Sequence, residues 1–232
     1  VYKRILNKDG LLEVIKYRIG LNNTGEMWCL SFRTIIRGYS AIRGLVSFFK
    51  PSIAASIYKN LLGNPNVVLD PCCGFGGRML GYFINNPKGK YIGCEPNKET
   101  YQELIKLRNS ISEYYGFEID CILYNKTIEE FVEDDLENHN DIECAFTSIP
   151  YFNIEVYSED TVGNNYKNFE EWDEKFIGSL KKIKNCYINL PEKLSERLKL
   201  KPLETHYMIN NVSIHFDKTK TKTIVFLNLI CN

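Results

Sequence analysis

The stretch from residue 67 to residue 78 constrains the fold of this chain most. It reads VVLDPCCGFGGR, an apolar strand pattern that runs into a loop with three glycines and then into the start of a helix. This order places backbone N–H groups and a helix N-terminus at the carboxyl end of a strand, where α/β proteins bind ligands. Glycine suits such a loop because a side chain would block the approach of a ligand to the backbone. A P-loop is excluded, since no Lys-Ser/Thr follows the glycines, and the spacing is not G-x-G-x-x-G.

A carboxylate follows the next predicted strand. Glu95 comes at the end of the apolar run Tyr91–Cys94, 25 residues after Asp70. An acid at that place can accept both hydrogen bonds of a ribose diol. The two features together predict a site for a nucleoside-containing ligand.

From residue 63 onward, short apolar runs alternate with longer amphipathic segments, which is typical of βαβ units and a mainly parallel sheet. Asn97 and Asn168 are well placed to cap helices. The pattern predicts a doubly wound α/β fold with a C-terminal antiparallel hairpin that turns at residues 218–222. The expected strands are 67–69, 91–94, 119–123, 142–147, 186–190, 207–216 and 223–230; the expected helices are 52–62, 78–85, 98–115, 128–137, 169–184 and 192–198.

The domain organisation follows from the same pass along the chain. Residues 51–232 form the predicted α/β domain, and residues 1–50 form a short N-terminal extension that could contact a substrate or a partner. The chain begins at Val1 without methionine, which indicates a processed terminus or a piece cut from something longer.

The glycine loop and Glu95 resemble the cofactor loop and ribose-binding acid of class I S-adenosylmethionine-dependent methyltransferases. That resemblance implies a Rossmann-like, seven-stranded sheet and S-adenosylmethionine as cofactor. Asp70 would then lie near the methionine moiety, and Asn125, after the third strand, would contact the adenine amine. Residues 48–51 resemble the family's segment that closes over the methionine end. The implied cofactor-binding residues are Phe49, Lys50, Pro51, Asp70, Pro71, Cys72, Gly74, Phe75, Gly76, Gly77, Glu95, Pro96 and Asn125. We expect Gly76→Leu to abolish cofactor binding with little loss of fold.

A second motif follows the fourth predicted strand, where the chain reads Ser148-Ile149-Pro150-Tyr151-Phe152. It resembles the Asp/Asn/Ser-Pro-Pro-aromatic loop of DNA amino-methyltransferases that act on adenine N6 or cytosine N4, including those of phages and mobile elements. The resemblance makes Ser148, Ile149, Pro150 and Tyr151 catalytic: Ser148 and the carbonyl of Ile149 would hold the amine hydrogens, and Tyr151 would stack on the base.

The motif departs from the family at Ile149, where the family has proline. The backbone carbonyl survives this change, but the fixed φ is lost and an N–H that needs a partner is gained. Phe152 and Trp172 are the further candidates for substrate contact. Trp172 has an alternative interpretation as a helix core anchor.

Charge is balanced overall but not along the chain. Residues 1–50 hold nine Lys/Arg against three Asp/Glu, residues 181–232 hold ten against four, and residues 51–180 hold ten against 22. Basic ends suit phosphate contacts, which favours nucleic acid as partner, and the family resemblance implies DNA; the alternative is that these charged runs are solvated helix faces. About 80 residues after the second motif leave little room for a recognition domain, so target recognition would fall to residues 1–50, to the loop at residues 152–168 or to a partner subunit.

Two other functions stay open at this stage. One keeps the cofactor and changes the acceptor to RNA, a protein amide or a small molecule. The other is a non-catalytic subunit that keeps the fold. The eight cysteines form no C-x-x-C pair, which favours reduced thiols and no metal site. No apolar run approaches about 18 residues, which favours an intracellular, cytoplasmic protein.

Overall fold

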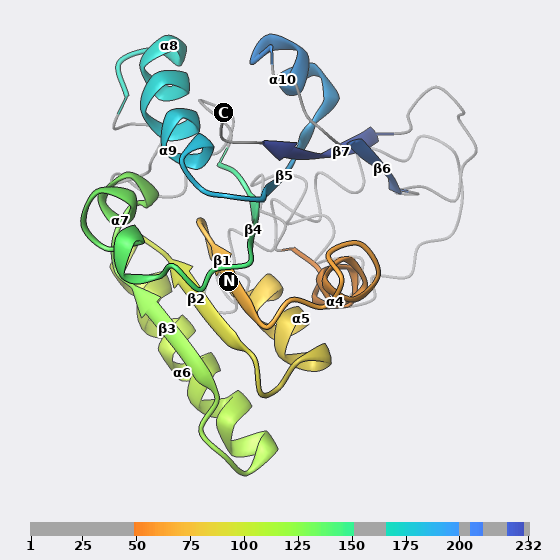
Figure 1. Ribbon diagram of the computed structural model, residues 1–232, viewed down its shortest axis with the longest axis vertical. Coiled ribbons are helices and arrows are strands. Elements are labelled where there is room, and N and C mark those ends of the chain that lie inside the picture. The colour runs from red at the N-terminus through yellow and green to blue at the C-terminus, as the bar shows by residue number, and fades with distance from the viewer. Residues whose placement is uncertain (1–48, 151–165, 200–204, 211–221, 230–232) are drawn as a thin grey trace, which may run out of the picture. The chain divides into compact units, whose positions relative to one another are not determined.

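The computed structural model describes residues 49–150, 166–199, 205–210 and 222–229, all within one compact unit, Phe48–Asn232. Seven strands form one sheet in the order β3-β2-β1-β4-β5-β7-β6 (Figure 1). Their bounds are β1 Val67–Asp70, β2 Lys90–Cys94, β3 Asp120–Tyr124, β4 Cys144–Ser148, β5 Cys186–Pro191, β6 Thr205–Asn210 and β7 Lys222–Leu229. The first five strands are parallel, and β7 pairs antiparallel with both β5 and β6.

The strand order reverses between β1 and β4. From β1 the chain proceeds to β2 and β3 on one side, whereas β4 and β5 extend the sheet on the other side. A crevice at the carboxyl ends of the strands forms at such a switch point, and it is where open α/β sheets bind ligands. The glycine loop and the second motif both begin at this point, after β1 and β4.

Two layers of helices cover the two faces of the sheet. Val68, Tyr91 and Phe146 face one apolar cluster, and Leu69, Ile92 and Ala145, their neighbours along the strands, face the other. This alternation is the period of two expected of strands that are buried on both faces. The first cluster contains residues of α4 Pro51–Asn60, α5 Gly77–Asn85 and α6 Lys98–Tyr115. The second contains residues of α7 Ile128–Asp134, α8 Phe169–Trp172, η3 Asp173–Ile177 and α9 Gly178–Lys181, with α10 Glu192–Arg197 packed beside it.

Local sequence signals define several helix ends. The Asn97 side chain accepts a hydrogen bond from the Thr100 N–H, and the Asn168 side chain accepts one from the Glu171 N–H. Both predicted N-caps are therefore confirmed. Thr127 and Glu130 form a reciprocal capping box at the start of α7.

The predicted fold class is confirmed in its coarse form, a parallel sheet of five strands with helices between them. The predicted helix 128–137 is split into α7 and a short 3-10 helix, η1 Leu136–Asn138, and the predicted helix 169–184 contains a π-helical turn, η3. The sixth strand is described over Thr205–Asn210, and the rest of the strand predicted at 207–216 lies outside the described residues. Residues 1–48 and most of the expected turn at 218–222 lie outside the described residues. No helix in the described part of the chain is long and apolar enough to cross a membrane.

Candidate functional site

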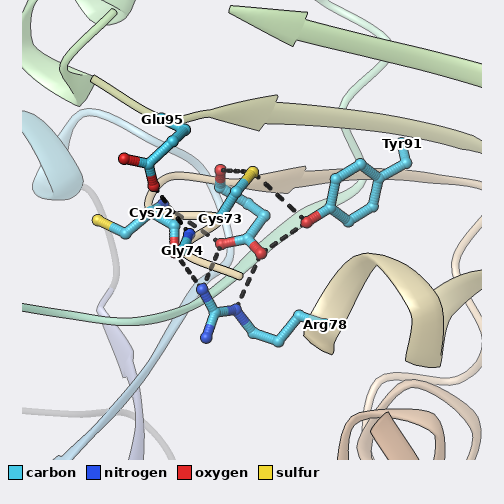
Figure 2. A network of polar contacts seen from close by, with 7 residues as sticks. Cys72, Cys73, Gly74, Arg78, Tyr91 and Glu95 are labelled. Carbon is cyan, nitrogen blue, oxygen red and sulfur yellow. Dashed lines mark hydrogen bonds and ion pairs between the residues drawn. The ribbon is translucent and has the colours of Figure 1, made fainter. Parts of the chain in front are cut away.

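Asp70, the last residue of β1, forms hydrogen bonds that connect the glycine loop to the neighbouring strand and helix. Its carboxylate accepts two hydrogen bonds from Arg78, at 2.9 Å from Nε and 3.1 Å from Nη2, and one from the Tyr91 hydroxyl at 2.6 Å (Figure 2). The Cys72 N–H donates to the same carboxylate at 3.3 Å, and Arg78 also donates to the Cys72 carbonyl. Asp70 is fully buried and Arg78 is 4% exposed. The Asp70 side chain therefore binds β1, β2 and α5 together; the predicted contact of its backbone with a methionine moiety stays a prediction.

The tyrosine in this network keeps its proton. Burial, together with the Asp70 carboxylate beside it, raises the pKa of the Tyr91 hydroxyl well above its ordinary value. Tyr91 therefore acts as a hydrogen-bond donor to Asp70 at every physiological pH.

The glycines of the loop have different roles. Gly74 and Gly76 both have positive φ, +53° and +75°, which L-residues rarely adopt. A Cβ on Gly76 would lie 2.6 Å from Leu107 Cδ2 and 2.8 Å from Leu104 Cδ2 of α6. Among the residues that the structure describes, a Cβ on Gly74 would meet nothing within 4 Å. The prediction that Gly76→Leu would spare the fold is therefore wrong, because Gly76 makes room for α6; Gly74 is the glycine that borders open space.

The other residues of the loop are likewise either buried in the fold or exposed. Gly77 is buried at the start of α5, and Pro71 is buried behind β1. Phe75, between the two positive-φ glycines, is 57% exposed. Its ring is therefore available at the tip of the loop.

Glu95 connects the end of β2 to the glycine loop. Its Oε2 accepts a hydrogen bond from the Gly74 N–H at 3.0 Å, and its Oε1 accepts one from the Asn97 N–H at 2.9 Å (Figure 2 shows the first contact). The side chain is only 9% exposed. Burial raises the pKa of the Glu95 carboxyl to about 7, against the effect of the two N–H donors. A carboxylate has about four lone-pair sites, so two remain for a ligand.

Asn125, which follows β3, lies beside Glu95 at the carboxyl edge of the sheet. Its Nδ2 donates to the Glu95 carbonyl at 2.9 Å and to the Pro96 carbonyl at 3.0 Å. The structure therefore brings together four of the predicted cofactor-binding residues, Gly74, Glu95, Pro96 and Asn125, from the ends of three neighbouring strands.

The segment before α4 reaches the same region from the other side. The Phe49 ring packs edge-on against Phe146 of β4, with 5.6 Å between ring centroids, and the Arg78 guanidinium lies 5.5 Å from the Phe49 centroid. Lys50 is exposed, and Pro51 occupies the first turn of α4. Phe49 thus lies between the network under the glycine loop and the strand that carries Ser148.

Ser148, the last residue of β4, lies at the same edge as the loop. In the register of β1 and β4, Leu69 pairs with Ala145. Cys72 follows Leu69 by three residues, and Ser148 follows Ala145 by three residues. Burial raises the pKa of the Cys72 thiol well above its ordinary value. Ser148 is partly exposed. The second motif and the glycine loop are therefore neighbours across the switch point.

The residue that departs from the family pattern has a packing role. Ile149 is 2% exposed and belongs to the apolar cluster with Phe169, Trp172 and Phe176. Isoleucine anchors the loop to this core, where proline would fix φ instead. Pro150 is partly buried, and Tyr151 and Phe152 lie outside the described residues.

Trp172 is part of the apolar core. It is fully buried, stacked on Phe176 with 5.6 Å between ring centroids and an interplanar angle of 11°. Its predicted substrate role is corrected in favour of the core anchor, because a ring without exposed surface cannot stack on a ligand.

Arg78 and Tyr91 belong to the site's framework, although the sequence did not identify them. A buried aspartate needs compensating donors. The available signals were an arginine in the first turn after the loop and a tyrosine inside the neighbouring strand. Six cysteines of the described segments are free, and no group of three or more metal-ligating side chains occurs in those segments.

No family model matches the chain, and no curated protein matches it. Solved structures with a similar fold include an S-adenosylmethionine-dependent O-methyltransferase from Thermotoga maritima, at 12% identity, 84% coverage of this chain, 71% of that chain and a TM-score of 0.49. A methyltransferase from Geobacter sulfurreducens has 11% identity, with 94% and 100% coverage and a TM-score of 0.46. A precorrin-6y C5,15-methyltransferase from Geobacter metallireducens has 11% identity, with 76% and 84% coverage and a TM-score of 0.46. At such identities and TM-scores the function has to be argued from the site itself.

Proposed function

We propose that this chain is an S-adenosylmethionine-dependent methyltransferase that acts on an exocyclic base amine, adenine N6 or cytosine N4, in DNA. One observation carries the proposal. The glycine loop, held by Glu95, and Ser148, at the end of β4, meet at the same edge of the sheet on either side of its switch point. A cofactor and an acceptor bound to these two elements would be neighbours.

The described residues fit the cofactor. Gly74 borders space that a Cβ would begin to fill, and the Glu95 carboxylate retains lone pairs for two ribose hydroxyls. The Asn125 amide lies against the Glu95 and Pro96 carbonyls, where its oxygen would accept the adenine amine. When bound, S-adenosylmethionine supplies an electrophilic methyl group on a sulfonium sulfur.

Ser148 supplies what an aryl amine needs from a protein. The nitrogen is a poor nucleophile because its lone pair is delocalised into the ring. Acceptors that hold its hydrogens favour the tetrahedral geometry in which the lone pair is available. The Ser148 hydroxyl and the Ile149 carbonyl would be these acceptors, and Ile149, anchored in the core, keeps that carbonyl in place. Stacking by Tyr151 remains part of the proposal.

The charge distribution supports a nucleic-acid acceptor. The basic segments 1–50 and 181–232 would contact phosphates, which gives affinity without sequence information. An exocyclic amine inside a duplex is out of reach of such a site, so the base would be flipped out or presented single-stranded. Target selection would then depend on the N-terminal segment or on a partner subunit.

The proposal is tested by transfer of labelled methyl from S-adenosylmethionine to double- and single-stranded DNA, total RNA and protein extract. We expect label in DNA, reduced about 100-fold or more by Ser148→Ala. Ser179→Ala, which removes a buried hydroxyl that bonds only within α9 and η3, is the matched control and should change the rate less than twofold. Label in RNA or protein alone would contradict the DNA assignment, and full activity of Ser148→Ala would contradict the catalytic assignment.

A further inference from the structure

Asn189 on β5 lies next to Ser148. The two residues are register partners in neighbouring parallel strands, whose backbones are about 4.8 Å apart. Because parallel partners point to the same face, both side chains lie on the face where Phe146 packs against Phe49. Asn189 is 5% exposed, whereas Ser148 is partly exposed.

The Asn189 side chain carries an unsatisfied acceptor. Within the part of the chain that the structure describes, its Oδ1 is buried and has no hydrogen-bond partner. A buried amide oxygen without a partner is costly, and each such group in a folded protein calls for an explanation, of which a catalytic role is one. A leucine of similar size would avoid the cost. The presence of an asparagine at this buried position therefore requires an explanation.

Ser148 offers that reason. A hydroxyl has one hydrogen and two lone pairs, so it can either donate or accept. To hold an amine hydrogen it must accept, and its own hydrogen must then point to another acceptor. Aspartate and asparagine at this position need no such help, because their carbonyl-type oxygens are acceptors already.

We propose that Asn189 is a positioning residue for Ser148: its Oδ1 accepts the Ser148 hydroxyl hydrogen and so directs the serine lone pairs toward the acceptor amine. The inference deepens the proposed function and rests on it. Rotation about the Ser148 Cα–Cβ bond brings the hydroxyl within reach of the neighbouring side chain, since register partners lie side by side.

The test is a double-variant comparison on the full chain with labelled S-adenosylmethionine and single-stranded DNA. We expect Asn189→Leu to lower kcat about tenfold while KM for DNA and the Kd for S-adenosylmethionine are unchanged. Asn189→Asp keeps an acceptor oxygen and should restore most of kcat. In a Ser148→Asp background, Asn189→Leu should change kcat less than twofold. Unchanged kcat in Asn189→Leu, or equal losses in both backgrounds, would overturn the inference.

A readout independent of activity separates this inference from the proposed function. Absence of methyl transfer by the unmodified chain to any acceptor would sink the proposed function. In that case the inference about Asn189 is still tested by urea denaturation, which compares the unfolding midpoints of Ser148→Ala, Asn189→Leu and the double variant. A hydrogen bond between the two side chains predicts that the shifts are not additive. Additive shifts would overturn it.

Discussion

The ion pair of Asp70 and Arg78 is the residue-scale feature on which the site is built. Both side chains are buried, and together with Tyr91 they connect the end of β1 to β2 and to α5. Removing one partner leaves an uncompensated charge in the core. Removing both with apolar side chains costs much less.

We therefore expect Arg78→Met to reduce the free energy of unfolding by about 3–5 kcal/mol, as for other broken buried pairs. Urea denaturation measures this change. The double variant Asp70→Leu/Arg78→Met should recover a large part of the loss. If the single variant were as stable as the unmodified chain, the pair would not hold the loop.

The carboxyl of Glu95 predicts a pH dependence of cofactor affinity. Its pKa is raised to about 7 by burial, and the ribose diol requires the ionised form as acceptor. The ionised fraction rises from about one tenth at pH 6 to about nine tenths at pH 8, so affinity should rise about tenfold over this interval. Calorimetric titration with S-adenosylmethionine measures it. In Glu95→Gln the profile should be flat, and an affinity that falls with pH would contradict the assignment.

Individual residue roles could be predicted where one local signal decides them. The positions of Glu95 and Gly74 could be predicted, because a strand end and a glycine loop fix where they lie, whereas their roles toward a cofactor stay a prediction. Trp172 and Gly76 could not, since their roles depend on which helix packs against them. The position of Asn189 beside Ser148 could not be predicted, because nothing in the run CYINLP at residues 186–191 indicates which residue of β4 lies opposite it.

At the scale of elements, the glycine loop serves two neighbours. Gly76 faces the leucines of α6, and Gly74 faces open space and donates its N–H to Glu95. One end of the loop thus packs against the fold, and the other borders open space. The strand and helix that flank it were predictable from apolar periodicity, whereas the direction of each glycine depends on tertiary packing.

This division predicts different results for three glycine variants. Gly74→Ala and Gly116→Ala, both at positive φ with open space around the added methyl, should each cost about 1–2 kcal/mol of stability. Gly76→Ala should cost about 1–3 kcal/mol more, because the methyl collides with α6.

Gly116 ends α6 and serves as the matched control. Gly74→Ala should weaken S-adenosylmethionine binding beyond its effect on stability, and Gly116→Ala should not. Thermal unfolding and calorimetry measure the two quantities. Equal binding by both variants would place the ligand elsewhere.

At the scale of the whole molecule, the sheet order brings distant segments to one edge. The residues around the site come from positions 49, 70–78, 95, 125, 148 and 189, and they meet because β1 and β4 are neighbours at the point of reversal. The alternation of strands and helices predicted the parallel sheet of five strands, since buried parallel strands have continuous apolar runs. It could not predict which face each strand residue occupies at the carboxyl edge.

Direct titration of the unmodified chain with S-adenosylmethionine tests whether the edge around the glycine loop binds the cofactor through Glu95. The matched variants are Glu95→Ala and Glu99→Ala, which removes an exposed carboxylate from the first turn of α6. We expect saturable binding at pH 8, weakened about 100-fold or more by Glu95→Ala and unchanged by Glu99→Ala, since two hydrogen bonds to a charged group contribute about 1.5–3 kcal/mol each. No binding by the unmodified chain, or equal binding by all three proteins, would contradict it.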